Sequence, residues 1–148
     1  MLARLELSVT KGCDGVDPDN VNGYDNDNGL GLTQASALDY VNFLADATYV
    51  RNLAIGLKNA GDIVPDVIHK MEWSVQEQCI QYGECDFCRP FIDQGNPVCH
   101  VEYPKGAATN NNASIATSQK ISICGDERAK GFSTIIKNMD LDQWIETC

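Results

Sequence analysis

Gly12-Cys13-Asp14-Gly15-Val16-Asp17-Pro18-Asp19-Asn20-Val21-Asn22-Gly23-Tyr24 is the stretch that decides the fold. Its Gly15-Val16 core is typical of a short buried strand. Pro18 has no backbone N–H and ends sheet pairing at the point where Asp17 and Asp19 project. In parallel α/β folds, functional side chains come from the carboxyl ends of strands. The stretch therefore predicts a strand at 15–19 that delivers acids to a functional site.

The composition limits the classes of protein and partner. The chain has 148 residues and is 43% hydrophobic, which is enough for one globular domain and too apolar for a disordered chain. Its net charge of −10 argues against nucleic acid or an anionic membrane as a partner and fits a cationic or neutral ligand. We expect no membrane segment and no signal peptide in this chain, because it has neither an 18-residue apolar run nor a basic-then-apolar leader.

Further along the chain, predicted strands alternate with predicted helices. Thr33 caps a helix that runs to about Asn52, and its apolar positions recur at helical spacing. The other expected strands are 53–57, 73–76, 97–101 and 131–136. The other expected helices are 2–10, 60–69, 84–94 and 140–147, with loops at 20–32 and 104–120. Strands joined by crossover helices predict an α/β fold with a parallel sheet or barrel.

Polar or ionic residues follow several of these strands. They are Lys58 and Asn59, Glu77 and Gln78, Glu102 and Tyr103, and Lys137. Because the carboxyl ends of parallel strands meet at one edge, we expect such residues to share a site.

Five segments together resemble a known family. They are the opening stretch from Cys13 to Tyr24, Gly56 to Asn59, Glu77-Gln78-Cys79 with Tyr82 and Cys85, Val101 to Tyr103, and Gly131-Phe132-Ser133 to Lys137. The pattern is similar to that of glycoside hydrolase family 114, the endo-α-1,4-polygalactosaminidases. The resemblance implies a secreted or cell-surface (β/α)8 TIM barrel of about 250 residues, monomeric when full length.

The strands found here resemble the fourth to the eighth of that barrel, and the first three are absent. We therefore expect residues 1–148 to form a single incomplete glycoside hydrolase domain, a partial TIM barrel. Five strands of eight cannot close a barrel, so an open edge would remain.

Hydrolysis of a glycosidic bond needs two carboxyl groups, one that protonates the leaving oxygen and one that attacks or activates water. The resemblance assigns Asp19 as the nucleophile and Glu77 as the acid/base. Strand alternation places Asp17 on the same side as Asp19, so the residues alone do not choose between them. Structural ion pairing with Lys58 is the competing interpretation. As a partner of Asp19, Lys58 would lower the pKa of the nucleophile.

Other polar and aromatic residues near the strand ends are candidates for binding the polysaccharide substrate. Each of them alone is more often structural. The candidates are Asp17, Asn20, Tyr24, Lys58, Asn59, Gln78, Glu102 and Tyr103.

Seven cysteines favour an oxidised, secreted protein. We expect disulfides between Cys79 and Cys85 and between Cys124 and Cys148, which leaves Cys13, Cys88 and Cys99. The Cys85-x-x-Cys88 motif also permits a dithiol redox site or, with Cys79, Cys99 and His100, a zinc cluster. No second C-x-x-C accompanies it, so we expect neither a metal nor a cofactor.

Two functions from different classes remain open on the sequence alone. One is a glycoside hydrolase that cuts α-1,4-linked galactosamine polysaccharide internally. The other is an inactive fragment or carbohydrate-binding module that retains the acids of the site.

Overall fold

The structure is a computed structural model that describes residues 1–27 and 29–148. Asn28 belongs to the predicted loop 20–32 and lies outside the described residues. The chain divides into two compact units, residues 1–75 and 76–148. Each unit is described separately below.

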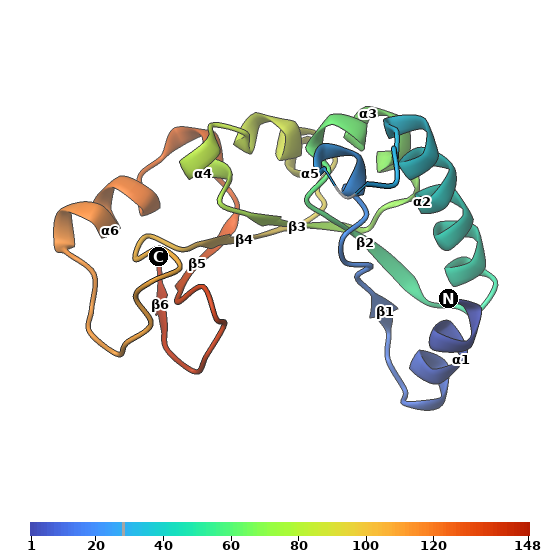
Figure 1. The fold of residues 1–148 in the computed structure, drawn as a ribbon, viewed down its shortest axis with the longest axis horizontal. Coiled ribbons are helices and arrows are strands. Elements are labelled where there is room, and N and C mark those ends of the chain that lie inside the picture. The colour runs from blue at the N-terminus through green and yellow to red at the C-terminus, as the bar shows by residue number, and fades with distance from the viewer. Residues whose placement is uncertain (28) are drawn as a thin grey trace. The chain divides into compact units, whose positions relative to one another are not determined.

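Helices and strands alternate for most of the chain (Figure 1). The helices are α1 (Leu2–Thr10), α2 (Gln34–Tyr49), α3 (Val64–Val67), α4 (Cys79–Tyr82), α5 (Arg89–Asp93) and α6 (Thr117–Cys124). The strands are β1 (Gly15–Val16), β2 (Ala54–Lys58), β3 (Trp73–Glu77), β4 (Val98–Glu102), β5 (Ser133–Lys137) and β6 (Ile145–Thr147). They are hydrogen-bonded in sequence order. The pairs β1–β2, β2–β3 and β4–β5 are parallel.

The first unit contains the predicted capped helix. Thr33 Oγ1 accepts a hydrogen bond from the Ser36 amide, and Ser36 Oγ accepts one from the Thr33 amide, which is a reciprocal capping box. The buried side of α2 consists of the residues that the helical spacing indicated, namely Ala37, Val41, Leu44, Ala45 and Thr48. In the same unit β1 is shorter than predicted and covers only Gly15 and Val16, because Pro18 cannot donate to a ladder.

Two glycines in this unit are required by one tryptophan. A Cβ on Gly56 would lie 2.1 Å from Trp73 Nε1, and a Cβ on Gly15 would lie 2.7 Å from Trp73 Cη2. The indole of Trp73 therefore occupies the space above β1 and β2 that side chains at 15 and 56 would fill. Any other residue at position 15 or 56 would place its Cβ against the indole. Trp73 at this position therefore requires glycine at both 15 and 56.

The second unit contains most of the differences from prediction. The segment 140–147 is not a helix but contains β6, which runs antiparallel to β5 beside it (Figure 1). Glu146, in the middle of β6, accepts a hydrogen bond from the Ile115 amide at 3.1 Å and pairs with Lys120 at 3.3 Å. These contacts and the β-branched residues on either side of Glu146 favour an extended chain over a helix.

Two helices of the second unit were not predicted. Helix α4 has only four residues and is ended by Gly83 at φ 76°, and α6 occupies the end of the predicted polar loop 104–120. The predicted helix 84–94 is instead a 3-10 turn, Cys85–Cys88, followed by α5, which starts with a proline in its first turn. Gly95 ends α5 at φ 80°, in agreement with the prediction. Among the described residues, no helix has the length and apolarity needed to cross a membrane.

Candidate active site

Three strand ends share one local conformation. Asp19, Lys58 and Glu77 are each followed by a residue with left-handed φ, namely Asn20 at 57°, Asn59 at 52° and Gln78 at 58°. Asparagine adopts this conformation readily, whereas glutamine does so at a cost. At two of the turns the backbone amide bonds to the next strand: Asn59 to the Val75 carbonyl and Gln78 to the Val101 carbonyl, each at 2.8 Å. The turns at Asn59 and Gln78 therefore mark the ends of β2 and β3.

In the first unit, Asp19 is paired with Lys58. Lys58 Nζ lies 3.1 Å from Asp19 Oδ1, and the side chain of Lys58 is 15% exposed whereas that of Asp19 is 65% exposed. The hydrogen bond from Lys58 lowers the pKa of Asp19 and outweighs the opposing effect of partial burial. Asn20 Nδ2 adds a second donor, 3.2 Å from Asp19 Oδ2. Asp19 is thus held as an accessible, ionised carboxylate.

Asp17 and Asp19 line the same groove, which has a volume of about 560 Å³. The groove lies against α1, β1 and α2, and its other lining residues include Val16, Tyr40 and Leu44. Because Asp17 lines the same groove as Asp19, it is still the second candidate for the nucleophile. Its role stays a prediction.

Tyr24 belongs to a 3-10 turn, Gly23–Asp25, in the same unit. Its hydroxyl donates to Asp62 Oδ1 at 2.5 Å, and burial, followed by the hydrogen bond to Asp62, raises its pKa. The phenol proton is thus engaged within the protein. Binding of the polysaccharide by Tyr24 stays a prediction.

In the second unit, Glu77 is bonded to Tyr103. The Tyr103 hydroxyl donates to Glu77 Oε1 at 2.5 Å, and Tyr103 is buried. Burial raises the pKa of Tyr103, and the hydrogen bond to Glu77 adds to the rise. Tyr103 therefore stays protonated and acts as the donor. Because the hydroxyl proton is donated to Glu77, only the ring and the oxygen lone pairs of Tyr103 could contact a sugar. Its role as a sugar ligand stays a prediction.

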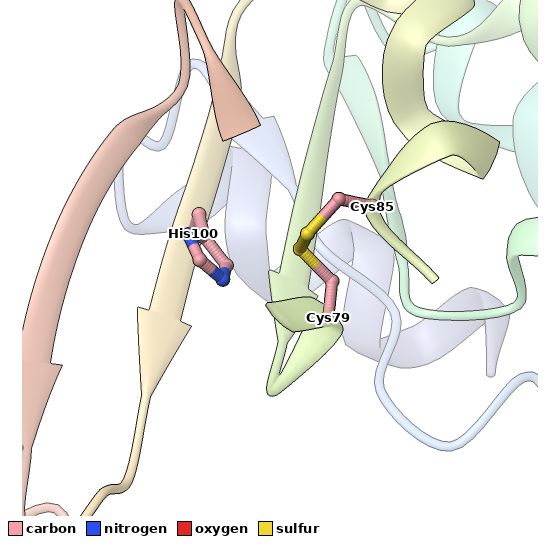
Figure 2. Close-up of side chains that lie close together, drawn as sticks. All are labelled: Cys79, Cys85 and His100. Atoms are coloured by element: carbon pink, nitrogen blue, oxygen red, sulfur yellow. A yellow bond between two sulfur atoms is a disulfide. The ribbon is translucent and has the colours of Figure 1, made fainter. Parts of the chain in front are cut away.

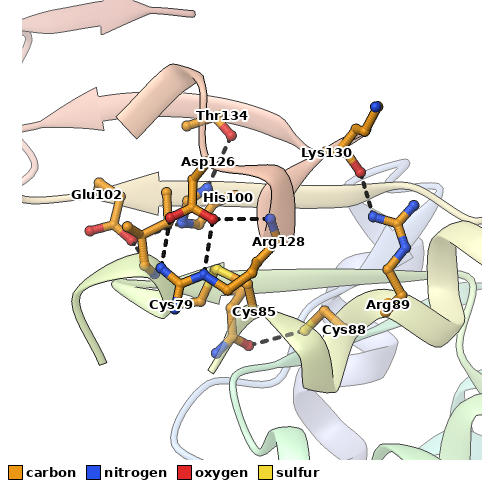
Figure 3. Close-up of a disulfide and its surroundings, with 12 residues drawn as sticks. Cys79, Cys85, Cys88, Arg89, His100, Glu102, Asp126, Arg128, Lys130 and Thr134 are labelled. Carbon is orange, nitrogen blue, oxygen red and sulfur yellow. Dashed lines mark hydrogen bonds and ion pairs between the residues drawn. A yellow bond between two sulfur atoms is a disulfide. The ribbon is translucent and has the colours of Figure 1, made fainter. Parts of the chain in front are cut away.

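Glu102 is buried and bound by protein groups (Figure 3). Its Oε1 accepts from the Ile80 amide in the first turn of α4 at 2.8 Å and lies 2.9 Å from His100 Nε2. On the other side of the ring, His100 Nδ1 lies 3.0 Å from Thr134 Oγ1. Glu102 thus joins β4 to the start of α4, and direct binding of sugar by this carboxylate stays a prediction.

The network of His100 and Thr134 was missed at the sequence level. The available signal was the spacing of His100 and Glu102, which puts both on one face of β4. Nothing in the sequence aligned Thr134 with them, because the register of β4 on β5 pairs His100 with Thr134 only in the folded sheet.

Gln78 is the remaining candidate of the second unit, and it follows Glu77 at the end of β3. The Gln78 side chain donates to Gln81 Oε1 at 2.8 Å. A hollow of about 340 Å³ is lined by Gln81, Glu102, Tyr103 and residues of α6. Polar groups of α4, β4 and α6 therefore line a hollow beside Tyr103.

Both predicted disulfides are present, Cys79–Cys85 and Cys124–Cys148. The ligand atoms of Cys79, Cys85 and His100 lie within 4.8 Å of one another, as Figure 2 illustrates. Because the two sulfurs are bonded to each other, they are not available as thiolate ligands in this state. Cys99, which the zinc alternative requires, is exposed and outside this group.

Cys13 and Cys88 are the other cysteines that form no disulfide among the described residues. Cys13 is exposed, whereas Cys88 is buried, with its sulfur 3.4 Å from Gln76 Oε1. The two sulfurs of the C-x-x-C motif are therefore not bonded to each other, since Cys85 is bonded to Cys79.

Asp19 lies in the first unit and Glu77 in the second. Their approach to one glycosidic bond stays a prediction. The structure does bring Asp19 together with Lys58 and Glu77 together with Tyr103.

Parallel strands with crossover helices, and carboxylates placed just beyond the strand ends, define an α/β fold of the kind on which many hydrolases are built. The sequence model described as glycoside-hydrolase family GH114 matches residues 1–148, and the chain belongs to this family. A search of curated proteins found no match.

Three solved structures are similar to this chain. The crystal structure of Aspergillus fumigatus Ega3 in complex with galactosamine matches with a TM-score of 0.96 and 59% sequence identity. The match covers 100% of this chain and 59% of that one, so this chain spans less than two thirds of the length of Ega3. The predicted fold class is confirmed as an α/β arrangement that corresponds to part of a GH114 barrel.

The glycoside hydrolase domain of PelA from Pseudomonas aeruginosa and its E218A variant match with TM-scores of 0.61 and 0.62 at 11% identity. Each match covers 99% of this chain and 61% of the PelA chain. At this identity the similarity concerns the fold alone.

Proposed function

We propose that the chain supplies the catalytic carboxylates of a glycoside hydrolase that cleaves α-1,4-linked galactosamine polysaccharide internally. The observation that carries the proposal is the Lys58–Asp19 pair, which holds an exposed carboxylate in its ionised form at a strand end. Membership of GH114 and the similarity to a relative solved with galactosamine support the reaction class and the sugar.

In this proposal Asp19 is the nucleophile. An ionised carboxylate attacks the anomeric carbon and forms a glycosyl–enzyme intermediate, which water then hydrolyses with retention of configuration. Lys58 suits this role because its positive charge favours the charged form of Asp19. Asp17, in the same groove, is the alternative nucleophile.

Glu77 is the acid/base in this proposal. It gives a proton to the leaving glycosidic oxygen in the first step and takes one from the attacking water in the second. The two steps need one carboxyl group that changes its protonation state during each turnover.

The charge of the chain fits an amino-sugar polymer. Unacetylated galactosamine units carry an ammonium group at neutral pH, and a protein with a net charge of −10 attracts such a substrate. Asp17, Asn20, Asn59 and Gln78 remain candidates for contacts with the sugar hydroxyls or the amine.

We extend the proposal to a secreted or cell-surface location. Two disulfides are expected of a protein that folds in an oxidising compartment. A polysaccharide substrate outside the cell is consistent with this location.

A second candidate function is polysaccharide binding without cleavage. It is favoured by the exposure of Asp19 and the net charge of −10, since such carboxylates attract a cationic polymer whether or not they cleave it. In this case the acids would bind the cationic polymer and leave it intact.

The test is hydrolysis of partly deacetylated α-1,4-galactosamine polymer by the 148-residue chain, with products followed by mass spectrometry. We expect shorter oligosaccharides from the unaltered chain, a loss of roughly 10²- to 10⁴-fold in Glu77→Gln, and a comparable loss in Asp19→Asn. Asp14→Asn is the matched control, since it removes an exposed carboxylate from the same stretch without touching either site. Full activity in both site variants would exclude this assignment.

Binding and folding separate the two candidates. If the chain leaves the polymer intact but binds it at low salt, and the binding weakens in Asp19→Asn, the binding function is correct. Gel filtration and circular dichroism of the same samples show whether the chain is a folded monomer.

A further inference from the structure

The loop between β4 and α6 carries an acceptor triplet that the proposed hydrolysis does not use (Figure 1). Its residues Asn112-Ala113-Ser114 fit the pattern Asn-x-Ser with no proline in the middle, which marks an asparagine that can receive an N-linked glycan. No other triplet of the 148-residue sequence fits this pattern with serine or threonine at its third position. The sequence therefore offers a single acceptor, at Asn112.

The loop is anchored immediately before Asn112. The carbonyl oxygen of Asn111 accepts hydrogen bonds from Lys105 Nζ at 2.8 Å and from Asn138 Nδ2 at 3.0 Å. The Asn111 side chain accepts a further bond from the Ala113 amide at 2.9 Å. Because Asn138 is buried, this anchor ties the loop to the interior of the second unit. The backbone of Asn112 is therefore held in place on its N-terminal side.

The loop is anchored again just after the triplet. The Ile115 amide donates to Glu146 Oε1 of β6 at 3.1 Å, and Glu146 also pairs with Lys120 of α6 at 3.3 Å. Between the two anchors, all three residues of the triplet are exposed. A glycan on Asn112 would then project into solvent without displacing a packed side chain.

We propose, on the basis of the secreted location proposed above, that Asn112 is an N-glycosylation site. The donor is an oligosaccharide joined to a lipid diphosphate, of the class found in the lumen of eukaryotic secretory compartments. A bond forms between Asn112 Nδ2 and the anomeric carbon of the first sugar, and the bond from that carbon to the diphosphate breaks. The lipid diphosphate leaves with the bonding electron pair, and Nδ2 loses one proton to the transferring enzyme.

The disulfides of the chain fit the compartment that this modification requires. Cys79–Cys85 and Cys124–Cys148 are bonds of the kind that form in an oxidising lumen. A chain that acquires them in the lumen of the endoplasmic reticulum meets the oligosaccharide donor in the same place. The disulfides and the acceptor triplet are independent features of the sequence that point to one compartment.

The test is expression of the 148-residue chain behind a secretion leader in yeast, with the mass of the chain measured before and after treatment with peptide-N-glycosidase F. We expect the unaltered chain to carry a glycan that the enzyme removes, which leaves an aspartate at position 112. Chain from the cells is measured as well as chain from the medium, because the glycan is added during translocation and does not depend on export. An unaltered chain without a glycan in both fractions overturns the proposal.

Variants of the triplet and of a neighbouring residue identify the modified side chain. Asn112→Gln and Ser114→Ala should each abolish the glycan, the second although Asn112 is still present. Ser114→Thr should keep it, because threonine preserves the acceptor pattern. Asn110→Gln is the matched control and should also keep it, since Asn110 is an exposed asparagine of the same loop outside the triplet. A glycan that persists in Ser114→Ala, or that disappears in Asn110→Gln, overturns the assignment to Asn112.

The mass measurement is independent of hydrolysis, so the two proposals can fail separately. If Asn112 is glycosylated and the chain leaves the polymer intact, the inference is correct and the proposed cleavage is wrong. If the chain expressed in yeast cleaves the polymer but carries no glycan, the cleavage is correct and the inference is wrong.

Discussion

The indole of Trp73 lies so close to Gly56 that a Cβ at position 56 would come within 2.1 Å of Trp73 Nε1. Gly56→Ala should therefore destabilise the chain by about 1–3 kcal/mol through overpacking, measured by urea unfolding. The control is the same substitution in a Trp73→Leu background, where the clash is absent and the added cost should be small. An equal cost in both backgrounds would mean that the indole is not the reason for the glycine.

The Lys58–Asp19 pair predicts a pH effect with a defined sign. In Lys58→Met the carboxyl loses its hydrogen-bond donor and positive neighbour, so the pKa of Asp19 should rise. Because Asp19 must be ionised to attack, the acidic limb of kcat/KM should move to higher pH. Lys70→Met is the matched control, since it breaks the Lys70–Asp46 pair of the same unit, away from the strand end. The same movement in both variants would contradict the assignment.

The two disulfides should differ in their contribution to stability. Cys79 and Cys85 are 6 positions apart, and Cys124 and Cys148 are 24 apart. In the loop-entropy model, replacing the first pair by alanine costs about 2 kcal/mol and replacing the second about 3.5 kcal/mol. Urea unfolding of the two double variants measures the difference. A larger loss for the shorter loop would mean that packing of the Cys79–Cys85 bond against Ala129 and Phe132 contributes more to stability than loop closure does.

The left-handed φ of Gln78 predicts that two substitutions at this position differ in their effect on stability. Gln78→Gly places the residue best suited to φ 58° at this site and should not destabilise the chain. Gln78→Val places a β-branched residue there and should cost about 1–2 kcal/mol. Both variants lose the hydrogen bond to Gln81, so the difference between their melting temperatures isolates the backbone.

The sequence was sufficient to predict the elements that depend on local signals. The cap at Thr33 and the spacing of apolar residues predicted α2 and its buried side, and polar residues after strands predicted the ends of β2 and β3. Both disulfide pairs were also predicted.

The missed features depend on contacts between distant segments. β6 exists because β5 offers it an antiparallel partner and Ile115 and Lys120 bind Glu146. The partnership of Tyr103 with Glu77 likewise needs the end of β4 to lie beside the end of β3. Neither contact leaves a periodic pattern in the sequence.

Asn20, Asn59 and Gln78 share a left-handed backbone conformation. The path of the main chain at these turns therefore does not depend on the charge of the residue that precedes the turn. The residue before each turn is an acid in two cases and a base in the third, yet the chain leaves the strand in the same way. A single codon change at such a position can therefore alter the ionic character of the strand end without redirecting the loop that follows.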